Sequence, residues 1–229
     1  DEAGGRAKVI VNAGMPATFE TKLLAREFDH IGVDGIAVIT PFFIACTQDS
    51  LIRHFTSVAD AVETPVYLYN IPARTQNHIE PETARTLARH TNIVGIKDSG
   101  GAQETLKAYL KVSREVDDFS VYSGPDQLVH WSLINGAKGC ISGLGNVLPS
   151  VLARIVACVN TGDDTGAAEA QATYTKFRTD LYELGYPPAM VKRALFLRDH
   201  SVGASRQPAL LPDPDKDKKI EKILHKYGV

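Results

Sequence analysis

The sequence predicts an α/β protein in which a parallel β-sheet is covered by α-helices. Short apolar runs alternate with longer amphipathic segments, and glycine or proline lies at the turns between them. This alternation occurs six times along the chain. Because parallel strands joined by helices all point the same way, the polar residues that end the strands are expected at one rim of the sheet.

The first unit shows how the elements are recognised. The run Lys-Val-Ile-Val-Asn-Ala at residues 8–13 predicts a strand, which a glycine and a proline end. A helix follows, with Thr18 as its expected cap and Gly32 as its stop. Its apolar face is formed by Leu23, Leu24, Phe28 and Ile31. The second strand is predicted at residues 34–40, before a proline.

The same unit then repeats through the middle of the chain. The helix predicted at residues 47–62 carries on one face Leu51, Ile52, Phe55, Val58 and Ala59. Further strands are predicted at residues 66–71, 93–97, 119–122 and 138–142. Further helices are predicted at residues 80–90, 103–116, 126–135 and 147–160. Residues 1–160 are therefore expected to form strand–helix units throughout.

The pattern changes after residue 160. A polar loop at residues 161–166 leads into three predicted helices without a strand between them. These helices are predicted at residues 167–184, 188–200 and 215–227. Residues 161–229 are therefore expected to form a C-terminal helical extension.

Composition excludes several classes of protein. The chain has 229 residues, 44% of them hydrophobic and 23% charged, which suits one large globular domain. A net charge of -2 gives no general attraction to nucleic acid or to a membrane surface. Its 3 cysteines have no metal-ligand spacing, and no apolar run approaches the roughly 20 residues of a membrane span. We expect a cytoplasmic protein with reduced thiols.

The run Ile-Val-Gly-Ile-Lys-Asp-Ser-Gly-Gly at residues 93–101 contains the first candidate catalytic residue. A buried strand here ends on Lys97, followed by small turn-forming residues. Burial at the mouth of an apolar core lowers the pKa of an amine and makes it a nucleophile for a carbonyl carbon. The alternative is that Lys97 only caps the strand and reaches water along its aliphatic stem.

Tyr69 is the second candidate. It lies near the end of the preceding predicted strand, in the run Val-Tyr-Leu-Tyr-Asn-Ile-Pro at residues 66–72. If both runs are parallel strands joined by a helix, Tyr69 and Lys97 emerge side by side at one end of the sheet. A phenol beside an amine is an acid/base pair suited to carbonyl chemistry. The alternative is a core tyrosine that is bonded to a backbone carbonyl.

Four motifs, in this order and at this spacing, resemble the dihydrodipicolinate synthase and N-acetylneuraminate lyase family. They are Tyr-Asn-Ile-Pro at 69–72, Gly-Ile-Lys-Asp-Ser-Gly-Gly at 95–101, Tyr-Ser-Gly-Pro-Asp at 122–126 and Gly-Ala-Lys-Gly-Cys-Ile-Ser at 136–142. The resemblance extends from about Lys8 to Pro212. It is specific for the family and much less specific for the substrate.

The resemblance implies a TIM (β/α)8 barrel of which six βα units are visible in this sequence, plus the C-terminal helical extension. Residues 1–160 would be barrel units 3 to 8. Family members normally begin with two more units, and a Thr-Thr-Gly-Glu-like turn in them contacts the substrate carboxylate. Because six strands with two open edges would expose apolar surface and unpaired backbone groups, we expect an N-terminal portion beyond the residues given.

The resemblance also implies a lysine Schiff-base mechanism. Lys97 would attack the keto carbon of pyruvate or of a longer 2-oxo acid, and Tyr69 would move the protons as general acid and base. The iminium ion is itself the electron sink, so the reaction needs neither a metal nor another cofactor. The family's helical extension helps to build an oligomer, so a homo-oligomer, either a dimer or a tetramer, is expected.

Four further residues are expected to bind substrate. The turn from Gly143 to Asn146 follows the last strand. Its backbone N–H groups, at a helix start, could hold the 2-oxo acid carboxylate. The alternative is that the segment is only a common glycine turn before a helix. Ile141 would line the pocket behind the lysine, or pack in the core. Arg74 would pair with the carboxylate of a second substrate, as in the family's synthases, or be a solvated loop arginine.

Two departures from the family pattern leave the substrate open. Phe42 and Phe43 follow Thr40-Pro41 where the family's synthases have tyrosines, one of which completes a proton relay across a subunit interface. Gln76-Asn77 replaces a glycine. The rivals to a synthase are an aldolase acting on 4-hydroxy-2-oxoglutarate or a 2-keto-3-deoxy sugar acid, a non-catalytic relative that binds a small acid, and a phosphate-binding barrel enzyme.

Overall fold

The structure, a computed structural model, describes residues 2–199, 202–210 and 213–229. The chain forms two compact units. The first unit holds Asp1–Pro125 and Asn135–Cys140, and the second holds Asp126–Ile134 and Ile141–Val229. In the described part of the chain, no helix is both long and apolar enough to cross a membrane.

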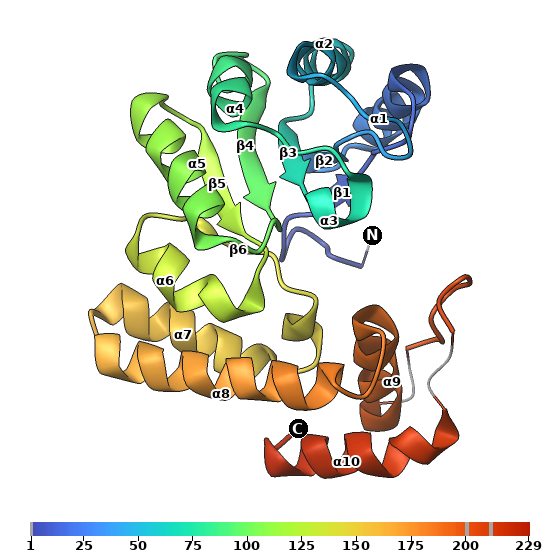
Figure 1. Ribbon diagram of the computed structural model, residues 1–229, viewed down its shortest axis with the longest axis vertical. Helices are drawn as coiled ribbons and strands as arrows, with labels where there is room; N and C mark the ends of the chain where they lie inside the picture. Colours follow the sequence, from blue (N-terminus) through green and yellow to red (C-terminus); the bar gives the residue numbers. More distant parts are fainter. Residues whose placement is uncertain (1, 200–201, 211–212) are drawn as a thin grey trace. The chain divides into compact units, whose positions relative to one another are not determined.

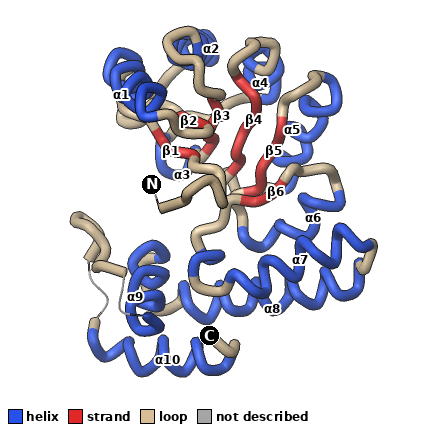
Figure 2. The backbone as a smooth tube through the Cα atoms, turned by 180° about the vertical axis from the view of Figure 1, so that it is seen from behind, coloured by secondary structure: helices blue, strands red, loops and turns tan. Residues whose placement is uncertain are grey.

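The first unit is built on a six-stranded parallel sheet whose strands lie side by side in chain order. The strands are β1 (Ile10–Asn12), β2 (Gly35–Ile39), β3 (Val66–Asn70), β4 (Ile93–Asp98), β5 (Ser120–Ser123) and β6 (Gly139–Cys140). Figures 1 and 2 show that the sheet curls into a half-barrel. The predicted parallel sheet of strand–helix units is confirmed.

Helices cover the convex face of this sheet, as Figure 1 shows. They are α1 (Thr18–Ile31), α2 (Gln48–Ala59), α4 (Pro81–Leu87) and α5 (Gln103–Glu115). A four-residue helix that the sequence did not predict, α3 (Pro72–Thr75), follows β3 directly. It begins at a proline, whose fixed φ and missing N–H suit the first turn of a helix.

The predicted cap of the first helix is wrong, and its predicted stop is confirmed. The N-cap is Ala17, which makes no side-chain capping bond. The Thr18 hydroxyl is instead 2.9 Å from Nδ1 of His54 on α2, so it joins two helices. Gly32 ends α1 in the left-handed conformation, at φ 81°, which glycine adopts without strain.

The core lies between the sheet and the helices. Alternate residues of each strand point to this side, and the apolar ones are fully buried. On the strands they are Ile36, Val38, Val66, Leu68, Ile96 and Val121, and on the helices Leu51, Phe55, Val58, Leu106 and Leu110. The intervening strand residues occupy the concave face, where Tyr67, Tyr69, Lys97 and Tyr122 are half-buried.

Glycines on the strands make room for the aromatic rings of the concave face. A Cβ added at Gly35 would lie 2.8 Å from the Tyr67 ring. A Cβ added at Gly95 would lie 2.5 Å from the carbonyl oxygen of Ser120 and 3.1 Å from the Tyr67 ring. Real Cβ atoms do not approach so closely, so a side chain at either position would push the sheet or the ring away.

The second unit is helical, as predicted for the C-terminal extension, and its described residues contain no strand. Its α-helices are α6 (Val129–Ile134), α7 (Pro149–Thr161), α8 (Asp164–Tyr182), α9 (Pro187–Asp199) and α10 (Asp217–Lys226). Three short 3₁₀ helices, η1 (Asp126–Leu128), η2 (Leu144–Asn146) and η3 (Pro214–Lys216), precede α6, α7 and α10. The predicted helix end at His200 lies outside the described residues.

Two elements of the structure differ from their predicted bounds, and side-chain hydrogen bonds occur at both places. The helix predicted at residues 126–135 is split into η1 and α6. Gln171 accepts from the N–H of His130 (2.8 Å) and donates to the carbonyl of Asp126 (2.9 Å), so it replaces a helical bond between them. The strand predicted at residues 138–142 is only β6 (Gly139–Cys140), and beyond its end the Ser142 hydroxyl bonds Asp126 and Tyr174.

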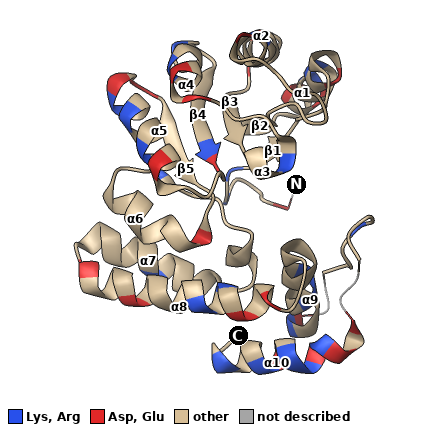
Figure 3. Cartoon of the chain, in the orientation of Figure 1, with Lys and Arg blue, Asp and Glu red and all other residues tan. Residues whose placement is uncertain are grey.

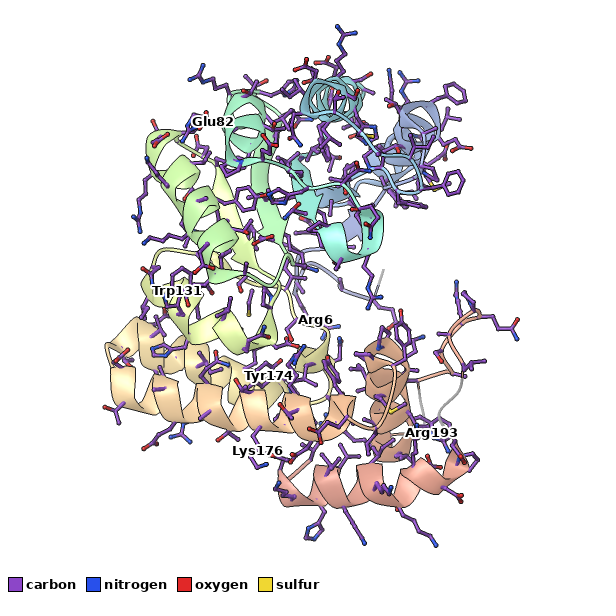
Figure 4. The ribbon with its side chains drawn as sticks, viewed as in Figure 1. Arg6, Glu82, Trp131, Tyr174, Lys176 and Arg193 are labelled. Atoms are coloured by element: carbon purple, nitrogen blue, oxygen red, sulfur yellow. The ribbon has the colours of Figure 1, made fainter. Side chains whose placement is uncertain are left out.

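Ion pairs tie α10 to its neighbours within the second unit. Arg193 on α9 donates through Nε to Asp217 at the start of α10 (2.8 Å), as can be followed in Figure 4. Asp180 on α8 accepts from Lys226 (2.7 Å) and from the Tyr227 hydroxyl (2.8 Å). These bonds, with that from Lys226 the strongest, hold the pKa of Asp180 at about 2.

We expect Gly95→Ala to lower the free energy of unfolding by about 1–3 kcal/mol, because the new methyl meets the backbone of β5. Gly139→Ala is the matched control, since its Cβ would lie 3.5 Å from the Tyr122 ring, an ordinary contact. Urea unfolding of the two variants measures the difference. Equal stability of the two would contradict the packing of the concave face described above.

We expect Asp180→Asn to destabilise the protein by about 1 kcal/mol at neutral pH, a figure that allows for the exposure of its lysine partners. Because the pKa of Asp180 is lower in the folded state, its contribution is complete above the unfolded pKa near 4 and is lost as the pH falls toward 2. Urea unfolding from pH 7 to pH 2 should show the gap between wild type and variant closing. A gap that stays constant would exclude this ion pair as its cause.

Candidate active site

Lys97 and Tyr69 lie together on the concave face of the first unit. They are direct partners in the parallel register of β3 and β4. The Lys97 Nζ atom is 4.1 Å from the centroid of the Tyr69 ring, close enough for a cation–π interaction. Figure 3 shows the positive charge near the carboxyl end of β4, followed by the negative charge of the next residue. The adjacency that the strand–helix pattern predicts is therefore present.

Two further tyrosines flank the lysine, and the sequence reasoning did not assign them a role. Tyr122 on β5 is the register partner of Lys97 on its other side. Tyr67, two residues before Tyr69, packs edge-on against Tyr122 with ring centroids 5.9 Å apart. Burial, and then the nearby Tyr122 phenol, raise the pKa of Tyr67 above its usual value. Strand alternation could have identified both, because Tyr67, Tyr69, Lys97 and Tyr122 share one face.

A hydroxyl network closes the carboxyl end of β2. Thr40, directly after β2, is fully buried and donates to the hydroxyl of Thr75 on α3 (2.7 Å). The Thr75 hydroxyl also donates to the carbonyl of Asn77 (3.1 Å). Arg74 lies one residue earlier on α3 and is exposed. The network therefore fixes the backbone that carries Arg74 at the same end of the sheet as Lys97.

Asn77 anchors the loop that contains the two phenylalanines. Its side-chain amide donates to the carbonyls of Pro41 (2.7 Å) and Ile44 (2.8 Å), and its side-chain oxygen accepts from the N–H of Cys46 (2.7 Å). Phe43, in this loop, has φ 77° and is 95% exposed. The loop is thus held at both ends while one aromatic side chain stands in solvent. In the sequence alone, Asn77 is recognised only as part of Gln76-Asn77, which replaces a glycine of the family pattern.

The other three predicted binding residues, Ile141, Gly143 and Asn146, belong to the second unit. Ile141 is 43% exposed. The Gly143–Asn146 turn is built by Ser142, whose hydroxyl accepts from the N–H of Gly145 (3.0 Å). The Asn146 side chain donates back to the carbonyl of Gly143 (2.9 Å).

The expected helix start at this turn needs correction. The turn is itself the three-residue η2 with Gly143 as its N-cap, and α7 begins only at Pro149. The backbone N–H of Asn146 is used inside the turn, because it donates to Gly143. Gly143 itself faces open space and lines a pocket of about 500 Å³ together with Asn146 and residues of α8 and α9.

The arrangement in the first unit supports carbonyl chemistry. A primary amine lies beside one phenol ring on the same face and is paired with another tyrosine on the next strand. Each of the three residues is next to last in its parallel strand, so all three lie at the carboxyl edge of the sheet, where (β/α) barrels hold their active sites. An amine can form an imine with a ketone, and a phenol can exchange the protons that this requires.

Comparison with known proteins places the chain in a family. A family model described as the Dihydrodipicolinate synthetase family matches residues 1–227. The 4-hydroxy-tetrahydrodipicolinate synthase of Methanospirillum hungatei is 33% identical over 228 residues, 99% of this chain and 77% of the relative. The synthase of the same name from Alkaliphilus oremlandii is 35% identical over 226 residues, 98% of this chain and 77% of the relative.

Solved structures agree with the sequence comparison. YagE, an Escherichia coli K12 prophage protein of the dihydrodipicolinic acid synthase family solved in complex with pyruvate, superposes with a TM-score of 0.93. It is 30% identical, and the match covers 100% of this chain and 78% of that one. The match to the family model and these relatives agrees with the curled sheet that carries a lysine and a tyrosine at its carboxyl edge. The chain therefore belongs to the dihydrodipicolinate synthetase family.

Proposed function

We propose that this protein is a Schiff-base-forming lyase that condenses pyruvate with an aldehyde, or cleaves a longer 2-oxo acid to pyruvate. The observation that carries the proposal is the Tyr69–Lys97 pair, with the amine 4.1 Å from the ring centroid on neighbouring parallel strands. Family membership supports the same chemistry, since members of the family are pyruvate-dependent lyases and aldolases.

Lys97 is the nucleophile in this mechanism. Its neutral amine adds to the keto carbon of pyruvate, and the carbinolamine loses water to give an iminium ion. The positive nitrogen draws electrons from C3, which loses a proton to give an enamine. The enamine carbon attacks the aldehyde carbonyl to form the new C–C bond, and water then hydrolyses the imine and frees the lysine.

Tyr69 is the general acid and base. It donates a proton to the departing hydroxyl of the carbinolamine and recovers a proton when the imine is hydrolysed. Tyr69 is half-buried on the concave face, between the neighbouring strands β2 and β4. Tyr122, the register partner of Lys97 on β5, is a second phenol on the same side of the sheet.

The carboxylate of the 2-oxo acid is assigned to the Gly143–Asn146 turn, with Ile141 as an apolar wall. The free space at Gly143 supports this assignment. Arg74 is assigned to the carboxylate of the second substrate, because this exposed arginine lies on α3, which follows the strand that ends with Tyr69 and Asn70. Substrate binding at these residues is part of the proposal.

We also infer the wider architecture. The six βα units correspond to units 3 to 8 of a (β/α)8 barrel within residues 1–160, and residues 161–229 form the extension. Several exposed apolar side chains on α1 and on or next to β1 support a neighbour at the open edge of the sheet, among them Val9, Ile10, Phe19, Leu23 and Ile31. A homo-oligomer, dimer or tetramer, remains a prediction.

A second candidate function is an aldolase for 4-hydroxy-2-oxoglutarate or a 2-keto-3-deoxy sugar acid. Phe42 and Phe43 favour it, because neither side chain can carry a proton, and Phe43 is 95% exposed in its loop. The covalent step at Lys97 is common to both candidates. They differ in the aldehyde, so an aldehyde panel assayed with pyruvate separates them.

Incubation with pyruvate and sodium borohydride should add the mass of a reduced pyruvyl group to the peptide that contains Lys97. The reason is that borohydride reduces the iminium ion to a stable secondary amine. Peptide mass spectrometry locates the adduct, and Lys97→Arg, which keeps the charge without an amine of suitable reactivity, is the control. If the adduct appears on another lysine or on none, Lys97 is not the nucleophile.

Arg74→Ala should lower kcat/KM for an aldehyde that bears a carboxylate by roughly 10-fold to 100-fold, the loss expected from charge-assisted hydrogen bonds. Succinic semialdehyde tests this, and butyraldehyde, which lacks the charge, should be affected little. The rate of imine trapping should not change. Arg89→Ala is the matched control, because Arg89 is an exposed arginine just beyond the C-terminal end of α4. Equal losses with both aldehydes would reject Arg74 as the carboxylate ligand.

A further inference from the structure

Each of the two proposed catalytic residues is followed by a buried polar residue. Asn70 comes directly after Tyr69, and Asp98 directly after Lys97. Because successive side chains of a strand point to opposite faces, both lie on the helix side of the sheet. Both are 0% exposed. They therefore do not reach the concave face where substrate would bind.

A hydrogen bond joins these two side chains across the strands. Asn70 and Asp98 are register partners, like Tyr69 and Lys97 one step earlier. The Asn70 side-chain amide donates to Asp98 Oδ1 at 2.8 Å. A bond between a buried amide and a carboxylate is charge-assisted and stronger than a neutral one when the acid is ionised.

The bond is anchored on both sides by backbone N–H groups. Asn70 Oδ1 accepts from the N–H of Ile79 (3.0 Å), and Asp98 Oδ1 accepts from the N–H of Gly100 (2.9 Å). The backbones remain joined beyond the clamp, since the N–H of Ser99 donates to the carbonyl of Asn70 (2.8 Å). The ends of β3 and β4 are thus held where a sheet would otherwise begin to separate.

We propose that the Asn70–Asp98 pair is a positioning clamp that fixes the separation of the Tyr69 phenol and the Lys97 amine. The proposal rests on the proposed function, because positioning matters only if those two groups react together. Near-attack geometry in a covalent mechanism is sensitive to displacements of about 1 Å, which can cost about 10²-fold in rate. Loss of the clamp lets the two strand ends move independently by such amounts.

The surroundings of Asp98 make the clamp sensitive to charge. Burial raises the pKa of Asp98, while the bonds from Asn70 and Gly100 oppose that shift. Its Oδ2 atom, and the hydroxyl of its register partner Ser123, are buried without a hydrogen-bond partner in the part of the chain that the structure describes. His78 is among the groups whose charge acts on Asp98, and Tyr109 is among those on which the charge of Asp98 acts. A second carboxylate at position 70 would therefore be strongly disfavoured.

Asn70→Asp replaces the amide donor with a second carboxyl group, so it breaks the clamp at a pH high enough to ionise both carboxyls, which is the pH at which this variant is assayed. Exchanging the pair, Asn70→Asp with Asp98→Asn, restores it. The carboxylate at position 70 then accepts from Ile79 and from the amide at position 98, whose oxygen still accepts from Gly100. Asn70→Ala removes the donor without adding charge and serves as a second variant if Asn70→Asp does not fold.

Asn92→Asp is the matched control at the other end of the same strands. Asn92 precedes β4, and its amide donates to the carbonyls of Ala59, Val62 and Thr64 at 2.8–3.2 Å. This variant makes the same chemical change and also costs stability. It leaves the carboxyl ends of β3 and β4 untouched, so it separates loss of stability from loss of positioning.

The test measures the rate of pyruvate imine trapping and the steady-state kcat and KM for each variant at a temperature where each is folded. We expect Asn70→Asp or Asn70→Ala to lower the trapping rate and kcat at least about 10-fold, with KM changed little. The exchanged pair should recover most of this loss. Asn92→Asp should stay within about 2-fold of wild type. Equal effects of the position-70 variants and the Asn92 control, or no recovery in the exchanged pair, would overturn the clamp.

A failure of the proposed function is recognised separately. It appears as the absence of a Lys97 adduct in the wild type. In that case the rate at which acetic anhydride acetylates Lys97, read from the mass of its peptide, reports on the clamp without any substrate. This rate should change at least about 3-fold in Asn70→Ala, which removes the donor at any pH, and stay near the wild-type value in the exchanged pair. An unchanged acetylation rate in Asn70→Ala would overturn the clamp.

Discussion

The parallel register of β3 and β4 is the constraint on which the rest of the site depends. It pairs Tyr69 with Lys97 on the concave face and Asn70 with Asp98 on the helix face. A slip by one residue would turn every side chain of a strand to the opposite face. A slip of β4 would bury the amine among the helices and break the Asn70–Asp98 bond. One set of backbone bonds thus fixes the core and the candidate chemistry together.

Space on the concave face is created by glycine. Gly35 and Gly95 leave room for Tyr67, which packs against Tyr122 beside the lysine. Fully buried aliphatic residues on the other face of the same strands supply the hydrophobic stabilisation. The two faces therefore have separate roles, and the concave face can hold polar, half-buried side chains because the other face supplies the apolar core.

The sequence-based prediction misplaced several ends of helices and strands at positions where polar side chains form hydrogen bonds. Thr18 bonds a histidine of the next helix instead of capping its own, and Gln171 replaces the helical bond between Asp126 and His130. Ser142, which the sequence placed in a strand, lies beyond the end of β6 and bonds other side chains. Periodicity reports burial and not hydrogen-bond partners, so it predicted the elements and misjudged several of their ends.

The sequence by itself determined the alternation of strands and helices, the parallel sheet, the helical extension and the adjacency of Tyr69 and Lys97. Each of these follows from local periodicity and from the direction that a βαβ connection imposes. Only the tertiary structure revealed the edge-on contact of Tyr67 with Tyr122, the loop anchor Asn77 and the Asn70–Asp98 bond. These contacts join residues about 28 to 55 positions apart, or oblige a loop to fold back, and only the packed chain fixes which of them form.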